Sequence, residues 1–263
     1  MMQNKNIIFE KKNNVSKMII NRPDLLNAVD YRTIVEMKDL LLQIEKDPHT
    51  RVIIITGAGE KSFIVGADKN EIKMYFQDEE KAKDFEEYCR DTFSLIEDLG
   101  KPTLCAINGY AFGLGLQLAL ACTFRIVSEQ AKLRLPEINL GFFPSMGATQ
   151  RLTRLIGEAR STEMILTGES INGEEAYRIG LANRVVSSDE LMECVDKFAD
   201  KLSEKSPMTV RLAMDAIRHE KTMSIEDGLA YEAKLSDICL DTEDSKEGML
   251  ASIEKRKPIF KGK

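Results

Sequence analysis

The chain has 263 residues, of which 43% are hydrophobic and 30% are charged, and 37 Lys and Arg against 43 Asp and Glu give a formal net charge of −6. This acidic balance, with no long run of Lys or Arg, argues against nucleic-acid binding. The longest mainly apolar stretch, residues 111–122, is far shorter than the roughly 20 residues of a membrane-spanning helix, so we expect no membrane span.

The first residues contain no apolar segment of the kind that a secretory signal needs, so we expect a cytoplasmic protein. The five cysteines are well separated and include no C-x-x-C pair, which argues against a disulfide framework and a cysteine-bound zinc. With only two histidines, His49 and His219, a histidine-rich metal site or a Ser-His-Asp triad has little to build on. We therefore expect no metal site.

Helix-like and strand-like patterns alternate in the first half of the chain. Two short apolar runs, residues 6–9 and 15–20, flank the turn-prone asparagine pair 13–14 and predict an opening hairpin. Residues 33–44 carry apolar side chains at helical spacing, and the β-branched run 52–55 predicts a buried strand. Helix followed by a fully buried strand indicates a mainly parallel sheet covered by helices.

This alternation continues as far as residue 128. Residues 78–99 have an amphipathic pattern that predicts a long helix, which leads into a second buried strand at residues 103–107. An apolar helix that contains glycine follows, and then a further strand at residues 124–128.

Beyond Gly157 the pattern changes to successive helices. Ser187, three residues before Glu190, has the spacing of a capping box for the third of them. We therefore divide the chain into an α/β core, residues 1–200, and a helical C-terminal region, residues 201–263, with no linker between them. The helices are predicted at residues 161–166, 174–179, 189–202, 207–218, 225–240 and 243–255.

Two glycine-containing segments follow predicted strands. Residues 66–68 read Gly-Ala-Asp, and residues 108–115 read Asn-Gly-Tyr-Ala-Phe-Gly-Leu-Gly. The second segment lacks the third glycine of a dinucleotide fingerprint, and the loop at residues 56–62 lacks the GK[ST] order of a P-loop. The loop at residues 56–62 and the glycines of the second segment are better interpreted as places where backbone N–H groups are exposed.

With these two segments, the sequence resembles the enoyl-CoA hydratase/isomerase (crotonase) family over nearly the whole chain. Each matching motif is weak alone, but together and in order they are specific. The resemblance implies a crotonase-like spiral of ββα units, followed by a helical region that takes part in oligomerisation and covers the active site. The motifs are Asn-Arg-Pro at 21–23, Leu-Asn-Ala at 26–28, residues 52–57, Gly-Ala-Asp at 66–68, Asn-Gly-Tyr-Ala at 108–111, Pro-Glu at 136–137, Leu-Gly at 140–141, residues 149–152 with Gly157, residues 166–168 and residues 254–258.

An oxyanion hole is the first feature that the resemblance implies, made by the backbone N–H groups of Ala67 and Leu114. Two fixed donors stabilise the negative charge that develops on a thioester oxygen when an enolate forms. Leu114 stands where glycine is common in the family. Because the donor is a backbone group, the role survives this change if the turn suits a leucine.

Hydratases of this family also carry two glutamates that share proton transfer and water activation. The second matches Glu137, which the resemblance places in an apolar acyl pocket, where burial raises a carboxyl pKa. The first is replaced by Gln117, whose amide can hold a water but cannot exchange a proton at a useful pKa. Ser145, in a turn that is usually richer in glycine, is expected either near the reacting carbons or as an ordinary turn serine.

Coenzyme A enters this prediction as part of the substrate, and no separate cofactor is expected. The resemblance further implies a homohexamer, built as a dimer of trimers, for which the apolar positions Leu229, Ala233 and Ile238 supply contacts unless they fold back on the chain's own core. Lys255 of a neighbouring subunit is expected to reach a nucleotide phosphate of CoA. The ordinary alternative is that Lys255 is simply a solvated charge at a helix end. The expected contacts with CoA within one chain are Arg22, Lys61, Gly66, Asp68, Lys69 and Gly113.

Hydration of a 2-enoyl-CoA, or the reverse dehydration, is the leading hypothesis, because residues 149–180 and the C-terminus look hydratase-like. This would make the protein a lyase of fatty acid metabolism. An enoyl-CoA or dienoyl-CoA double-bond isomerase is the alternative, since one base moves a proton between two carbons and only Glu137 is available. Other enolate chemistry stays open, namely C–C cleavage, decarboxylation or thioester hydrolysis. A non-catalytic acyl-CoA-binding scaffold, which would exchange no α-proton with deuterated water, is the rival from another class.

Overall fold

Two β-sheets form the centre of the computed structural model, which describes residues 6–263 apart from the side chains of Tyr75, Phe76 and Lys221. The larger sheet has the strand order β1-β2-β3-β5-β7-β10, and the smaller has the order β4-β6-β8-β9. The strands are β1 (Ile7–Lys12), β2 (Val15–Ile20), β3 (Val52–Gly57), β4 (Ser62–Val65), β5 (Thr103–Ile107), β6 (Tyr110–Phe112), β7 (Phe124–Ser128), β8 (Lys132–Arg134), β9 (Ile171–Asn172) and β10 (Arg184–Val186).

The larger sheet opens with the predicted hairpin. β1 and β2 pair antiparallel, and Asn13 in the turn between them has a φ of +53°. Every other neighbouring pair in this sheet is parallel. Both the hairpin and the mainly parallel sheet are therefore confirmed.

From β3 to β8, successive strands alternate between the two sheets. β3, β5 and β7 each enter the larger sheet, and the strand that follows each of them, β4, β6 or β8, enters the smaller one. Helices follow each pair, so the chain winds through repeated ββα units, as the family resemblance implies. This arrangement brings the C-terminal ends of β4, β6 and β8 together, because these three strands are parallel neighbours.

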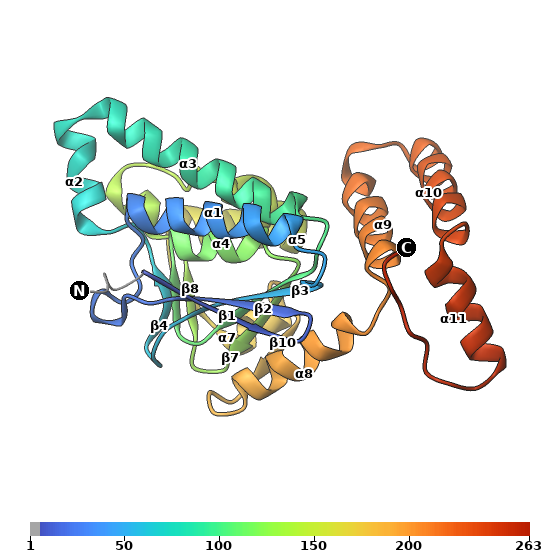
Figure 1. Ribbon diagram of the computed structural model, residues 1–263. Helices are drawn as coiled ribbons and strands as arrows, with labels where there is room; N and C mark the ends of the chain where they lie inside the picture. The colour runs from blue at the N-terminus through green and yellow to red at the C-terminus, as the bar shows by residue number, and fades with distance from the viewer. Residues whose placement is uncertain (1–5) are drawn as a thin grey trace.

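Helices cover both faces of the larger sheet (Figure 1). α1 (Tyr31–Lys46) and α3 (Glu79–Asp98) pack on one face, and α8 (Leu191–Ser203) packs on the other. Ile53 and Ile55 of β3 belong to the core beneath α1 and α3, while Ile54 belongs to the core beneath α8. Successive strand residues point to opposite faces, so a strand that is buried on both faces is apolar throughout.

Another helix, α4 (Leu114–Ala121), packs on β4 and β6 of the smaller sheet and on α3. Every residue of α4 is buried, which explains its continuously apolar sequence. The remaining helices are α2 (Lys69–Gln77), α5 (Ala148–Ile156), α6 (Glu158–Thr167), α7 (Gly173–Arg178), α9 (Pro207–His219), α10 (Ile225–Leu240) and α11 (Glu243–Ile253), with short 3-10 turns η1 (Pro23–Leu25), η2 (Pro136–Leu140) and η3 (Glu220–Thr222).

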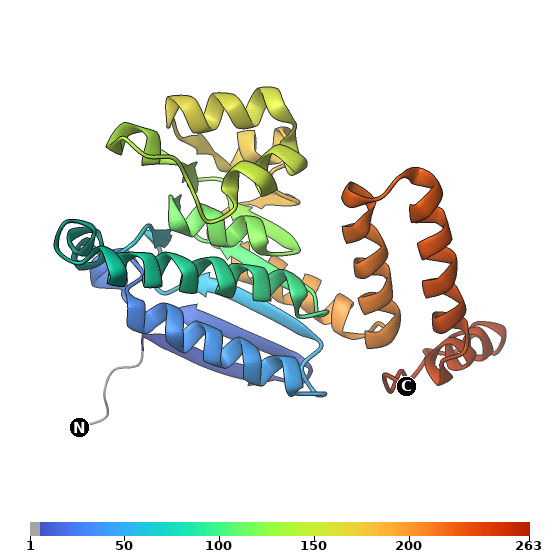
Figure 2. The same ribbon diagram turned by 90° about the horizontal axis from the view of Figure 1, so that it is seen from above.

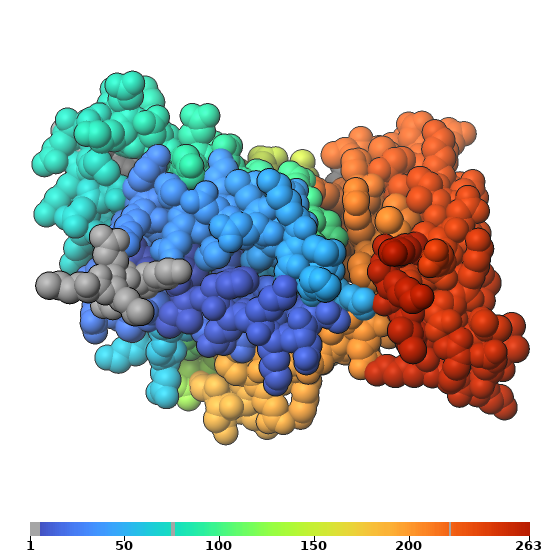
Figure 3. Space-filling model, viewed as in Figure 1, coloured from blue at the N-terminus to red at the C-terminus, as the bar shows by residue number. Residues whose placement is uncertain are grey.

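Helices α9, α10 and α11 form a lobe at one end of the molecule, as Figures 1, 2 and 3 show. α9 has no buried residue, and α10 buries only Leu235. Arg51 ties this lobe to the core, because its guanidinium donates to the carbonyl oxygens of Ser203 at 3.1 Å and Phe260 at 2.8 Å. The lobe therefore lies beside the α/β core and adds little to it.

Two expectations for the second half of the chain are wrong. The succession of helices is interrupted by β9 and β10, strands of two and three residues that are too short to show a period in the sequence. The capping box at Ser187 does not form, since α8 begins at Leu191 with Glu190 as its N-cap. The Ser187 hydroxyl instead donates to the Glu190 carboxylate at 2.7 Å.

Among the described residues, no helix is long and apolar enough to cross a membrane. The expectation about a secretory signal also concerns residues 1–5, which lie outside the described residues.

Candidate active site

Glu137 lies in η2, directly after the smaller sheet, and its side chain is buried, with 6% exposed. Its Oε1 accepts a hydrogen bond of 2.9 Å from Nε2 of Gln117. Its Oε2 is buried and has no hydrogen-bond partner in the described part of the chain. One carboxyl oxygen is therefore held in place, while the other has its hydrogen-bonding capacity unused by the described residues.

Gln117 is equally buried, on the inner side of α4. Its Oε1 accepts a hydrogen bond of 2.8 Å from the backbone N–H of Met146. Because a backbone N–H can only donate, this contact requires the amide oxygen on the Met146 side and the amide NH₂ on the Glu137 side. The orientation of the Gln117 amide is thus determined by its neighbours.

Burial raises the pKa of the Glu137 carboxyl above its ordinary value. Hydrogen bonds from its own backbone N–H and from the Gln117 amide stabilise the ionised form and offset part of this effect. A carboxyl with a raised pKa holds its proton more readily than an ordinary glutamate, which suits it to take up and return a proton.

Ala67 lies beside β6, in the segment that follows β4. Val29 pairs with it, since the N–H of Val29 donates to Gly66 and the N–H of Asp68 donates to Val29. In such a parallel bridge the N–H of the central residue, Ala67, points away from its partner. The N–H of Gly66 also donates to the carbonyl of Phe112 at 3.0 Å, which places this segment next to the start of α4.

Leu114 is the first residue of α4, so its N–H belongs to the turn that has no partner within the helix. The unusual backbone conformation falls on the preceding residue, Gly113, with a φ of +52°, and not on Leu114. A Cβ on Gly113 would lie 3.2 Å from Oε1 of Glu137. The glycine therefore permits both the turn and the close approach of the Glu137 carboxyl to the N-terminus of α4, and a leucine at 114 is compatible with a backbone donor.

Arg22 and Asp68, two of the residues expected to contact CoA, are paired with each other. The Arg22 guanidinium lies 2.8 Å from Oδ2 of Asp68 and 3.1 Å from Oδ2 of Asp30. Asp68 also caps α2, because it accepts from the N–H of Asn70 at 2.9 Å. These contacts fix the segment that contains Ala67, and they occupy both charges.

The other expected contacts differ in position. Lys61 and Lys69 are exposed near the two ends of the β4–Ala67 segment, and Gly66 within it has a φ of +68°. Ser145 is half-buried and adjacent to Met146, with its Oγ 3.8 Å from the Met146 sulfur. Lys255 is exposed just beyond α11. Helix α11 lies at the opposite end of the molecule from α2 (Figure 1). Within one chain, Lys255 is not brought to the site.

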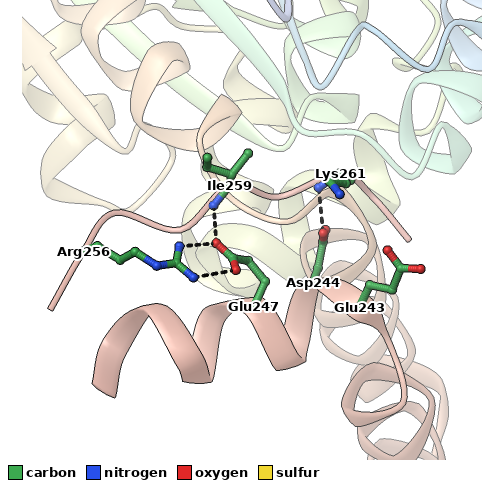
Figure 4. A pocket seen from close by; sticks show the side chains of 6 residues that line it. All are labelled: Glu243, Asp244, Glu247, Arg256, Ile259 and Lys261. Atoms are coloured by element: carbon green, nitrogen blue, oxygen red, sulfur yellow. Dashed lines mark hydrogen bonds and ion pairs between the residues drawn. The ribbon is translucent and has the colours of Figure 1, made fainter. Parts of the chain in front are cut away.

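A pocket of about 340 Å³ lies at the C-terminal end of the chain (Figure 4). Several of the residues that line it make hydrogen bonds with one another. The Glu247 carboxylate pairs with both terminal nitrogens of Arg256, at 2.6 and 2.8 Å, and Asp244 accepts from the N–H of Lys261. The carboxylates of Glu247 and Asp244 are therefore already engaged by the chain itself. No group of His, Cys, Asp or Glu side chains in the described ranges is arranged to hold a metal ion.

The N–H of Met146 was not predicted as part of the site. A backbone group leaves no mark in the residue types, because every residue except proline has an N–H. The single signal in the sequence is the nearby motif at residues 149–152, which lies just after Met146.

The spiral of ββα units and the buried carboxyl beside a helix N-terminus define an enzyme with the crotonase fold. The model of the enoyl-CoA hydratase/isomerase family matches residues 10–263. The crystal structure of an enoyl-CoA hydratase from Bacillus anthracis has a TM-score of 0.95 to this chain at 38% identity, and covers 98% of this chain and 100% of that one.

Curated relatives agree with this structural likeness. A crotonyl-CoA hydratase from Syntrophomonas wolfei is 40% identical over 259 residues, which are 98% of this chain and 99% of that protein. A short-chain-enoyl-CoA hydratase from Clostridium acetobutylicum is 40% identical over 256 residues, 97% of each chain. The chain belongs to the enoyl-CoA hydratase/isomerase family.

Proposed function

We propose that the protein adds water to a 2-enoyl-CoA, or catalyses the reverse dehydration, with Glu137 as the only proton-transfer group. The observation that carries this proposal is the buried Glu137 carboxyl, with one oxygen held by Gln117 and the other free of described partners. The relatives named as crotonyl-CoA hydratase and short-chain-enoyl-CoA hydratase support the same reaction.

In this mechanism the N–H groups of Ala67 and Leu114 bind the thioester oxygen. As the oxygen of water bonds to Cβ, Glu137 takes a proton from that water, and the electron pair of the double bond moves into the thioester to give an enolate. The same proton is then returned to Cα. Removal of one such oxyanion donor typically costs about 3 kcal/mol of transition-state stabilisation.

Isomerisation is the second candidate, and the contacts of Gln117 favour it. The amide oxygen accepts from Met146 and one amide N–H is donated to Glu137, so most of the capacity of Gln117 to orient a water is already used. A double-bond shift needs one base that takes a proton from one carbon and returns it to another, without activating water. A single carboxyl satisfies this requirement.

A panel of 2-enoyl-, 3-enoyl- and dienoyl-CoA thioesters tests the proposal. We expect the 2-enoyl-CoA to gain one water, measured by mass spectrometry and by loss of the conjugated-thioester absorbance. Conversion of a 3-enoyl-CoA without a change in mass, together with no hydration, would instead establish isomerisation. Binding with neither turnover nor α-proton exchange in deuterated water contradicts both reactions.

We also propose a homohexamer in which Lys255 of one subunit reaches a nucleotide phosphate of CoA bound to another. Supporting this, Leu229 and Ile238 are 58% and 52% exposed, so they do not pack on the chain's own core. Exposed apolar side chains gathered on one lobe are typical of an interface. Lys61 and Lys69 remain candidates for CoA contacts within a chain. A cytoplasmic location and a role in fatty acid metabolism belong to the same proposal.

A further inference from the structure

A continuous series of polar contacts leads from α3 to the Glu137 carboxyl. In its outer half, Nη2 of Arg151 lies 2.6 Å from Oε2 of Glu97, and Nη1 of Arg151 donates to the carbonyl oxygen of Met146 at 2.8 Å. In its inner half, the N–H of Met146 donates to Gln117, and Gln117 donates to Glu137. Each contact has the length of an ordinary hydrogen bond.

The geometry around Arg151 is specific. Its side chain is only 16% exposed, and a Cβ on Gly147 would lie 2.1 Å from Nη1 of Arg151. Gly147 has a φ of +92°, so a glycine is needed here for both the turn and the space that the guanidinium occupies. The sequence thus provides a fitted position for Arg151 against the turn that contains Met146.

We propose that Arg151, itself oriented by Glu97, is a positioning residue for the proton-transfer group. It holds the carbonyl of Met146 so that the N–H of the same residue faces Gln117, and Gln117 in turn presents its NH₂ to Glu137. This inference rests on the proposed function, because it takes Glu137 as the acid and base.

The consequence of losing this support follows from the Gln117 amide. If Met146 no longer fixes the amide oxygen, the amide can turn that oxygen toward Glu137, and two acceptors then face each other. The ionised carboxylate loses its donor, so its pKa rises further, and Oε1 is no longer held in one place. Displacement of a reacting group by about 1 Å can reduce the rate by roughly a hundredfold.

Other charged groups near η2 do not set the position or the pKa of the Glu137 carboxyl. Arg134, just before η2, directs its guanidinium to the carbonyl of Gly168. On α6, which packs against η2, Arg160 and Glu163 are exposed and paired with each other, and Glu158 is exposed. Burial, the residue's own backbone and Gln117 account for the shifted pKa of Glu137.

The test compares Arg151→Met with Arg154→Met, a matched control on the same helix whose guanidinium contacts Gln150. The pH dependence of kcat is measured with the thioester that the substrate panel identifies. For R151M we expect kcat at neutral pH to fall by about tenfold or more. The acid limb of the profile, where kcat falls as the pH decreases, should be displaced by about one pH unit to higher pH. KM should change by less than about threefold. R154M should keep the wild-type profile.

Conservative variants separate positioning from folding. Arg151→Lys should lie between wild type and R151M, because one ammonium cannot reproduce the two-sided contact of a guanidinium fork. Glu97→Gln should displace the acid limb in the same direction by a smaller amount, and it carries the test if R151M does not fold. Circular dichroism and thermal melting establish folding for each variant.

If R151M folds and its acid limb lies at the wild-type pH, the positioning role is overturned, whatever the value of kcat. If R151M does not fold, a wild-type acid limb in E97Q overturns it instead. Glu137→Gln distinguishes this failure from failure of the proposed function. If E137Q is inactive while R151M keeps the wild-type limb, only the role of Arg151 is lost. If E137Q is fully active, the proposed function fails, and the role of Arg151 fails with it.

Discussion

The amide nitrogen of Gln117 lies 2.9 Å from the carboxyl oxygen Oε1 of Glu137, and the two side chains are only 3% and 6% exposed. In the family pattern this pair is two glutamates. Two buried carboxyls at this distance must share a proton, whereas an amide donor lets the single carboxyl ionise. In the proposed mechanism, the acid–base chemistry of this pair therefore falls to Glu137.

The first prediction concerns Glu137→Gln. The amide has nearly the same shape, so binding of an acyl-CoA should stay within about threefold of wild type, while kcat falls by about a hundredfold or more. Isothermal titration with a substrate analogue and steady-state kinetics measure the two effects. A variant that keeps kcat would remove Glu137 from proton transfer.

The pH dependence of kcat provides the second prediction. Burial raises the pKa of Glu137, and the carboxyl accepts a proton only when it is ionised. Activity should therefore fall as the pH decreases through a value above the usual glutamate pKa of about 4.3. In Gln117→Met the donor to the carboxylate is lost, so this acid limb should move to higher pH. A limb at the ordinary glutamate value would show that Glu137 is not the base.

Much of the fold was predictable because long periodic segments carry it. Residues 33–44 and 52–55 correspond to α1 and β3, whose apolar residues are buried where the pattern placed them. The short strand β10 was missed, because its pairing with β7 is a tertiary contact that three residues do not encode locally. Prediction therefore succeeded where a pattern repeats over several turns or alternations.

The candidate site also has a part that could be predicted from the sequence and a part that could not. The family resemblance supplied Glu137 and Gln117, and the structure places them in direct contact. The resemblance gave no indication that Arg22 pairs with Asp68, because a sequence does not show which charged side chains meet. The N–H of Met146 could not be predicted for a different reason, because every residue except proline has this group.

Lys255→Ala tests the contact across subunits. A remote charge contributes uniform binding, so KM for the acyl-CoA should rise severalfold while kcat stays close to wild type, and the effect should shrink at high salt. Lys246→Ala, an exposed lysine on α11, is the control and should leave KM unchanged. An unchanged KM in Lys255→Ala would remove Lys255 from the site.

Assembly provides the fourth prediction. Sedimentation should give a hexamer for wild type, and Leu229→Asp combined with Ile238→Asp should shift the protein to smaller species, because a charge in an apolar interface is costly. Leu42→Asp, at a partly exposed position on α1, is the control and should stay hexameric. A monomeric wild type with full activity would contradict both the hexamer and the contact of Lys255 across subunits.

Gln117→Glu decides between the two candidate reactions. The new carboxylate can still accept from the N–H of Met146, but its other oxygen faces Glu137, so the two carboxyls must share a proton. If the native enzyme is a hydratase, this variant gains a second proton-transfer group, and hydration of a simple 2-enoyl-CoA should increase. If it is an isomerase, the added charge brings water activation into a site that excludes it, so a hydrated product should appear while double-bond migration decreases.

Gln117→Met is the control for this last comparison, because it removes the amide without adding a charge. It should raise neither hydration nor the yield of a hydrated side product, since a thioether cannot act as a base. An increase in Gln117→Glu alone therefore reports the carboxylate itself rather than a loosened pocket. If Gln117→Glu changes neither activity, the residue does not act on the reacting atoms, and its contact with Glu137 is structural.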